Sequence, residues 1–137
     1  MPAGYSGTPL PKKLGIADGT RVMLLAAPDG FDGTLGELPG GVDVVRTARG
    51  RADVIVAFFD RRRELEGRIE RLERAIFPDG GLWIAWPKRS SGLPTDMGDD
   101  VVREIALPRG LVDNKVCAID DTWTGLRLVW RRELRNR

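Results

Sequence analysis

The sequence contains no histidine and a single cysteine among its 137 residues. The absence of histidine excludes Ser-His-Asp and Cys-His catalysis, His-ligated zinc sites and histidine-based pH switches. The one cysteine, Cys117, can form neither an intrachain disulfide nor a CxxC site. Proton transfer or nucleophilic catalysis would therefore depend on carboxylates, lysines, Ser/Thr hydroxyls, Tyr5 or Cys117.

Long apolar runs are also missing, since none approaches the ~20 residues that a membrane span needs. The N-terminal residues lack the pattern of a secretory signal, so we expect a cytoplasmic protein. The length is typical of a single domain with its own core. We therefore expect one domain over residues 1–137, with a loose arm over 1–7 and a basic tail over 131–137.

Excess charge of one sign is absent from the body of the chain. The formal net charge is +2, but residues 131–137 hold four Arg and one Glu, or +3, which leaves −1 for the rest. A nucleic-acid-binding domain is expected to carry clustered Lys and Arg with interleaved aromatics on its body. Outside the tail, only the junction 60–63 offers a basic cluster. The charge distribution disfavours a nucleic-acid partner, and it leaves binding through the Arg-rich tail as a third hypothesis.

Apolar segments predict the strands of the fold. The near-continuous apolar runs at 21–28 and 53–59 are typical of strands buried on both faces of a parallel sheet. A shorter strand is expected at 42–47 and another at 82–87. Segments 114–120 and 125–131 predict an antiparallel hairpin around residues 121–124.

Helices are expected between these strands. The helix that Asp60 opens has the clearest pattern, with an apolar stripe at i, i+4, i+7 and i+11, and with the i,i+4 pairs Glu64–Arg68 and Glu70–Arg74. Residues 96–107 predict a second amphipathic helix that Pro108 ends. Shorter helices are expected from Thr8-Pro9 to Gly15 and over 31–38. The apolar stripe of the helix that Asp60 opens consists of Leu65, Ile69, Leu72 and Ile76.

The resulting order α-β-α-β-β-α-β-α-β-β predicts a three-layer α/β sandwich, with a mostly parallel sheet and a C-terminal antiparallel hairpin. The connection between Val45 and Val54 is short for a parallel crossover, which usually needs a dozen or more residues. Either an extended segment returns the chain along the sheet, or the two strands form a hairpin around 48–51. We favour the extended return, because both strands lack the alternation of a half-exposed strand.

Four strings resemble an uncharacterised bacterial domain family: GYSGTPLPKKLGI at 4–16, GLWIAWPK at 81–88, GLVDNKVCAID at 110–120 and TWTGLRLV at 122–129. This resemblance spans about residues 4–130 and brings no activity with it. LGIADGTRVMLLAAP and IFPDGGLWIAWPK are also similar to segments around two central strands of class I methyltransferases. That second resemblance implies a Rossmann-like fold.

The chain departs from that family where S-adenosylmethionine would bind. Methyltransferases of this class carry a GxGxG-type turn after the first strand, where glycines let the backbone approach the cofactor. Here Gly30, Gly33 and Gly36 are spaced by three, and Pro28 and Phe31 occupy the same loop. The second strand is followed by Arg46-Thr47 rather than by the carboxylate that binds ribose hydroxyls. We therefore expect no nucleotide cofactor.

Ligands in open α/β sheets bind at the carboxyl ends of the strands. The stretch Trp86-Pro87-Lys88-Arg89-Ser90-Ser91 is the strongest candidate there, because a lysine beside hydroxyls can hold an anion. Pairing of Lys88 with Asp60 or Asp120 is the competing structural role, and Lys115 is expected at the opposite edge. Asp120-Asp121 could bind Mg²⁺ with Asp60 or Asp29, but turn formation explains them better, so no metal is expected. The candidate ligand-binding residues are Asp29, Phe31, Asp60, Trp86, Lys88, Ser90, Ser91, Asp120 and Trp123.

Three functions remain, in this order of preference. The first is a non-catalytic module that binds a small anionic ligand or a protein partner on a methyltransferase-like fold. The second is an enzyme acting on an anionic metabolite, with Lys88 as anion clamp or base and Asp60 or Asp120 as its acid-base partner. The third is nucleic-acid binding through the tail. The sequence leaves the catalytic residues and the oligomeric state open.

Overall fold

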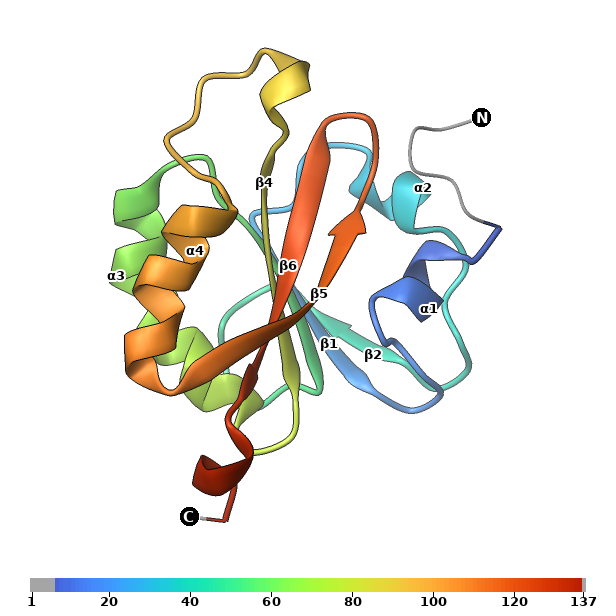
Figure 1. The fold of residues 1–137 in the computed structure, drawn as a ribbon. Helices are drawn as coiled ribbons and strands as arrows, with labels where there is room; N and C mark the ends of the chain where they lie inside the picture. The colour runs from blue at the N-terminus through green and yellow to red at the C-terminus, as the bar shows by residue number, and fades with distance from the viewer. Residues whose placement is uncertain (1–6, 137) are drawn as a thin grey trace.

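The computed structural model describes residues 7–136, which form a six-stranded sheet with helices on both faces (Figure 1). The strand order is β2-β1-β3-β4-β6-β5. The first four strands are parallel, and β6 is antiparallel to both of its neighbours, β4 and β5. The predicted α/β fold with a C-terminal antiparallel hairpin is therefore confirmed. The strands are β1 (Arg21–Leu25), β2 (Asp43–Val45), β3 (Val54–Phe58), β4 (Gly81–Pro87), β5 (Leu111–Ala118) and β6 (Trp123–Trp130).

The connection from β2 to β3 is an extended return. Both strands lie parallel to β1 on opposite sides of it, with Val22 of β1 opposite Val44 and Val54, so a hairpin between them is excluded. Eight residues, 46–53, suffice because β2 has only three residues and an extended residue spans about 3.3 Å. The Arg71 Nε donates to the Ala48 carbonyl oxygen at 2.8 Å and ties this segment to the helix beneath it.

One face of the sheet is covered by α3 (Arg62–Ile76) and α4 (Asp99–Ala106) (Figure 1). The predicted apolar stripe of α3 is buried against residues of β1, β3, β4 and β6. Of the two predicted ion pairs, Glu70–Arg74 forms, at 3.5 Å. Within residues 7–136 no ion pair joins Glu64 to Arg68. Arg62 instead binds Glu66 at 3.1 Å and Glu104 of α4 at 2.7 Å.

The other face carries two short helices, α1 (Leu10–Lys13) and α2 (Phe31–Leu35). A second apolar cluster forms beneath them, in which Leu14 and Trp83 are almost completely buried. The Trp83 indole Nε1 donates to the Leu14 carbonyl oxygen at 2.9 Å, so a tryptophan of the central sheet holds the end of α1.

The helix boundaries differ from the predicted ones by one to three residues. Asp96 does not begin α4. Its Oδ1 accepts a hydrogen bond from the Arg62 backbone N–H at 2.7 Å, at the start of α3. Pro108 lies inside a 3₁₀ turn, η2 (Leu107–Arg109), that extends α4. Two more such turns are η1 (Arg89–Ser91) and η3 (Arg132–Leu134). Among the helices of residues 7–136, none is long and apolar enough to cross a membrane.

Candidate functional site

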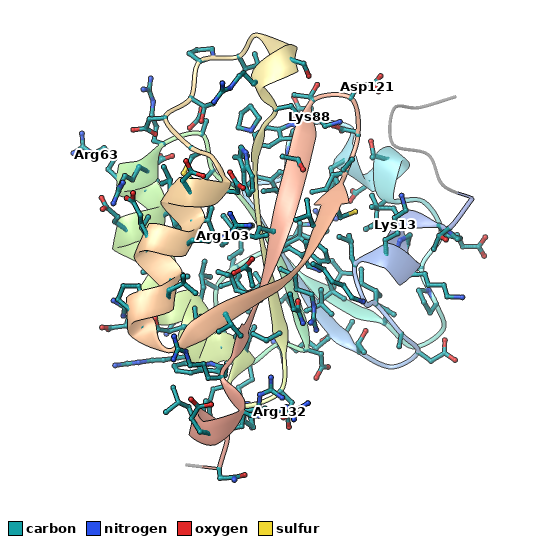
Figure 2. The ribbon with its side chains drawn as sticks, in the orientation of Figure 1. Lys13, Arg63, Lys88, Arg103, Asp121 and Arg132 are labelled. Atoms are coloured by element: carbon teal, nitrogen blue, oxygen red, sulfur yellow. The ribbon has the colours of Figure 1, made fainter. Side chains whose placement is uncertain are left out.

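The carboxyl ends of the parallel strands meet at one edge of the sheet. Pro28, Asp60 and Lys88 follow β1, β3 and β4, so all three leave the sheet on this rim. The β5–β6 turn reaches the same rim, because Trp123 at the start of β6 lies opposite Pro87 at the end of β4. Figure 2 shows Lys88 and Asp121 at this end of the molecule and Arg132 at the other.

Three aromatic side chains pack together on the rim. Phe31, at the start of α2, is only 2% exposed, and its ring centroid lies 5.0 Å from that of Phe58. The Phe58 ring lies 5.1 Å from that of Trp123, and both contacts are edge-to-face. The structure thus brings the candidates Phe31 and Trp123 together through Phe58. The position of Phe58 could have been predicted from the sequence, because the alternation of side chains along β3 directs Phe58 and Phe59 to opposite faces of the sheet.

The loop after β1 is shaped by unusual backbone angles. Ala26 has a positive φ of 57°, and Gly30, with φ 83°, caps the N-terminus of α2. Asp29 between them is exposed to solvent. At the end of the neighbouring strand β2, Arg46 Nη2 bonds both carboxylate oxygens of Asp32 of α2, at 3.0 and 3.1 Å. A basic side chain therefore stands beside the loop, and it is paired with α2.

Lys88 does not meet its predicted carboxylate partners. Its backbone N–H donates to the Thr122 carbonyl oxygen at 2.7 Å, but no carboxylate of residues 7–136 lies within 4.0 Å of its ammonium group. Asp120 Oδ1 accepts the backbone N–H groups of Thr122 and Trp123, both at 2.8 Å, and so stabilises the hairpin turn. Asp60 is exposed. Within the described part of the chain, no three His, Cys, Asp or Glu side chains are grouped so as to hold a metal.

A cavity of about 430 Å³ opens on the rim beside β4. Trp86 and Met97, 8% and 9% exposed, contribute apolar surface to it. The indole N–H of Trp86 donates to no residue within 7–136, although it is not sealed from solvent. The cavity is lined by Trp86, Pro87, Arg89, Gly92, Leu93, Thr95, Met97, Gly98 and Asp99.

Of the two charged side chains that line this cavity, Asp99 is in an ion pair and Arg89 is not. Asp99 binds Arg103 at 2.9 Å, and the hydrogen bond from Arg103 holds the pKa of Asp99 below its ordinary value. Arg89 forms no ion pair with any carboxylate of residues 7–136. Ser91 donates its hydroxyl to the Lys88 carbonyl oxygen at 2.6 Å and so supports the loop, while Ser90 is exposed. The cavity therefore presents one unpaired cation, Arg89.

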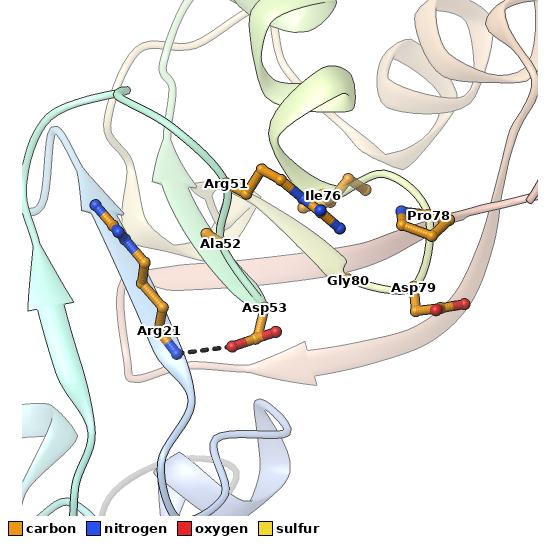
Figure 3. A pocket seen from close by; sticks show the side chains of 8 residues that line it. All are labelled: Arg21, Arg51, Ala52, Asp53, Ile76, Pro78, Asp79 and Gly80. Atoms are coloured by element: carbon orange, nitrogen blue, oxygen red, sulfur yellow. Dashed lines mark hydrogen bonds between the residues drawn. The ribbon is translucent and has the colours of Figure 1, made fainter. Parts of the chain in front are cut away.

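A larger cavity, about 520 Å³, lies at the opposite, amino edge of the sheet (Figure 3). Arg21, Arg51 and Asp53 in its lining already have hydrogen-bond partners in the fold. The Arg21 backbone N–H donates to Asp53 Oδ2 at 2.8 Å, and Arg51 Nη2 donates to the Phe77 carbonyl oxygen at 3.0 Å. A groove of about 870 Å³ runs between α1 and α2. Neither hollow was anticipated from the sequence, because each is formed by segments far apart in the chain.

Cys117 is expected to react slowly in the folded protein. Its side chain is 7% exposed, and burial raises the pKa of the thiol, an effect that the charges of Lys13 and Lys88 only partly offset. Because the thiolate is the nucleophile, alkylation by iodoacetamide at pH 8 should be at least about tenfold slower than in urea-unfolded chain. Mass spectrometry of timed samples measures this rate. Equal rates in the two states would contradict the buried position of Cys117.

Several solved structures with a similar fold are methyltransferases. A SAM-dependent methyltransferase from Aquifex aeolicus has a TM-score of 0.58 at 18% identity, with 85% of each chain covered. A putative type 11 methyltransferase from Sulfolobus solfataricus has a TM-score of 0.58 at 12% identity, with 89% of each chain covered. A ribosomal protein L11 methylase from Lactobacillus delbrueckii subsp. bulgaricus has a TM-score of 0.56 at 11% identity, over 84% of this chain and 72% of that one.

The chain thus has the Rossmann-like fold of SAM-dependent methyltransferases, which confirms that part of the sequence-based resemblance. At these identities the likeness establishes the fold alone. No protein-family model and no curated protein matches the sequence. The resemblance to an uncharacterised bacterial family therefore stays a prediction.

Proposed function

We propose that this chain is a non-catalytic binding module on a methyltransferase-like fold, and that it binds a small anionic ligand in the cavity beside Trp86. The proposal has two parts. The place where an adenosyl group would lie is filled by the protein's own side chains, and a different cavity on the same rim offers donors for an anion. The packing of Phe31 against Phe58 is the observation that carries the first part.

The contacts of the first loop do not fit S-adenosylmethionine. A glycine-rich turn would leave room for the cofactor above the end of β1, whereas here Phe31 is buried in that turn and contacts Phe58 of the adjacent strand. Seating a nucleoside there would require moving a side chain that is part of the core. At the end of β2, Arg46 is bound to Asp32 and offers ribose hydroxyls no acceptor.

The cavity beside β4 fits an anion better. Arg89 and Trp86 both line this cavity; the Arg89 guanidinium has no carboxylate partner, and the Trp86 indole N–H has no acceptor, within residues 7–136. A carboxylate or phosphate accepts both kinds of donor, and arginine binds such groups through two parallel hydrogen bonds. The pairing of Asp99 with Arg103 reduces repulsion of an anion by that carboxylate. No contact within 4.0 Å supports Lys88 with Asp60 or Asp120 as an acid-base pair.

The indole N–H signals of the four tryptophans test both parts in one ¹H–¹⁵N spectrum. Titration with succinate or inorganic phosphate should shift the Trp86 signal, which the Trp86→Phe variant assigns. Arg89→Gln should abolish that shift, and the exposed Arg63→Gln on α3 should leave it unchanged. S-adenosylmethionine and S-adenosylhomocysteine, up to about 1 mM, should not shift the Trp123 signal beside Phe58.

Two results would contradict this function. A shift of the Trp123 indole signal that saturates at micromolar concentrations of either adenosyl compound would place a cofactor against Phe31. A Trp86 signal that no anion moves would remove the ligand assigned to the cavity.

A further inference from the structure

A second, independent feature lies on the α1/α2 face of the sheet, at the paired strands β5 and β6. Arg127 stands in register with Trp83 of β4 and with Lys115 of β5, and Trp83 belongs to the apolar cluster of this face. Arg127 is half-buried, and its guanidinium lies directly over Gly81. A Cβ at Gly81 would fall 2.5 Å from Nε and 2.6 Å from Nη2 of Arg127. The absence of a side chain at position 81 is what lets the guanidinium lie there.

Arg127 has no carboxylate partner among residues 7–136. Within residues 7–136 its guanidinium forms no ion pair and donates no hydrogen bond, yet none of its nitrogens is sealed from solvent. Burial, and then the charge of Arg135, lower the pKa of Arg127. A partly desolvated cation beside a like charge costs free energy unless an anion from outside compensates it.

Two further cations extend this surface, which we define as the basic face: Lys115, Arg127 and Arg135. Arg135 follows η3, and its Nε donates to the Trp130 carbonyl oxygen at 2.8 Å, which anchors the tail beside the end of β6. Lys115 is exposed on the edge strand. It lines a hollow of about 380 Å³ whose floor includes Trp83 and whose other side includes Lys13. The basic face thus runs from this hollow to the C-terminal turn.

We propose that the basic face binds the sugar-phosphate backbone of a nucleic acid without reading its bases. Repeated phosphates match a row of cations from separate elements, and a guanidinium binds phosphate through two donors. Of the tryptophans near the C-terminus, Trp130 donates its indole N–H to the Glu73 carbonyl oxygen and packs against Phe77, so it is unsuited to stack on bases. An acidic protein is the less favoured partner, because protein interfaces centre on apolar side chains and Val116 is the one large exposed hydrophobic of β5 and β6.

The test uses the full chain and a fluorescein-labelled RNA of about 20 nucleotides and mixed sequence. Binding is followed by fluorescence anisotropy at KCl concentrations from about 25 to about 200 mM, a range over which phosphate contacts make the affinity strongly salt-dependent. The triple variant Lys115→Gln, Arg127→Gln, Arg135→Gln should bind at least about tenfold more weakly at the lowest salt. Its slope of log affinity against log salt should fall by about 2, since each phosphate contact contributes roughly 0.7 for single strands.

A matched control removes three exposed cations of α3 and the residue before it, on the other side of the sheet: Arg61→Gln, Arg63→Gln and Arg68→Gln. This variant loses the same net charge but keeps the basic face, and because the basic face is intact it should bind RNA as the parent chain does. Thermal unfolding of both triple variants shows whether each retains the fold. Where the first does not, Arg135→Gln alone should still weaken binding by about threefold or more.

Three results would overturn the proposal. Equal losses of RNA affinity in the two triple variants would indicate an effect of net charge alone. Binding of polyglutamate as tightly as RNA would indicate an acidic protein partner, and competition by millimolar inorganic phosphate would indicate a site for a single anion. The ligand proposed for the cavity beside Trp86 lies on a different edge, so the Trp86 signal reports its failure separately.

Discussion

Replacing Trp83 with alanine is expected to lower the free energy of unfolding by about 3–5 kcal/mol. Trp83 is 1% exposed at the centre of β4. Its ring fills the space above Gly125 of β6, where an added Cβ would come within 3.3 Å of the indole. Alanine would leave a cavity that short helices such as α1 and α2 cannot close. Urea unfolding followed by circular dichroism measures the loss.

The hydrogen bond of Trp83 can be separated from its packing. Trp83→Phe keeps most of the apolar volume but leaves the buried Leu14 carbonyl oxygen without its indole donor, which costs about 1–3 kcal/mol. Trp123→Phe is the matched control, because Trp123 is only half-buried at the rim. It should cost less than Trp83→Phe. Equal losses at the two positions would mean that the bond to Leu14 adds nothing to the anchoring of α1.

Strands and the long helix of this protein are predictable from the sequence because burial imposes a local pattern. The residues of β3 are buried on both faces, so an unbroken apolar run was sufficient to identify it and to favour a parallel sheet. The α3 stripe likewise follows from the 3.6-residue period. The extended return between β2 and β3 was also predictable, because neither strand alternates.

Contacts between distant segments were not predictable in this way. The sequence suggests that Asp96 begins its own helix, but in the fold its carboxylate accepts a hydrogen bond from the Arg62 backbone N–H, 34 residues away. Arg62 of α3 likewise forms an ion pair with Glu104 of α4. No local pattern reports such pairs, because they depend on how α3 and α4 pack.

The candidate rim shows the same division. Topology alone placed Pro28, Asp60 and Lys88 at one edge, since parallel strands end together. The side-chain partners on this rim could not be predicted from the sequence, which suggested a carboxylate partner for Lys88. The basic face was missed for a related reason. Counting charges along the chain assigns Arg135 to a tail, whereas in the fold its Nε donates to the Trp130 carbonyl oxygen at the end of β6 and its charge acts on Arg127.

Replacing Arg109 with methionine is expected to lower the free energy of unfolding by about 2 kcal/mol. Arg109 of η2 is paired with Glu73, a buried carboxylate on α3, and lies 3.8 Å from Glu70. Removing the guanidinium strands the Glu73 charge in the interior. The expected loss is below the ~3–5 kcal/mol of fully buried pairs, because a third of the Arg109 side chain is exposed and water can reach the site.

The companion variants distinguish a stranded charge from lost packing. Glu73→Met in the Arg109→Met background removes the unpaired carboxylate and should recover most of the lost stability, since apolar pairs often replace buried ion pairs at little cost. Arg74→Met breaks the exposed pair with Glu70 on the same helix and should cost less than about 0.5 kcal/mol. If the double variant were no more stable than Arg109→Met, the guanidinium would act on α3 and η2 through its methylene packing, and the charge of Glu73 would be satisfied by water.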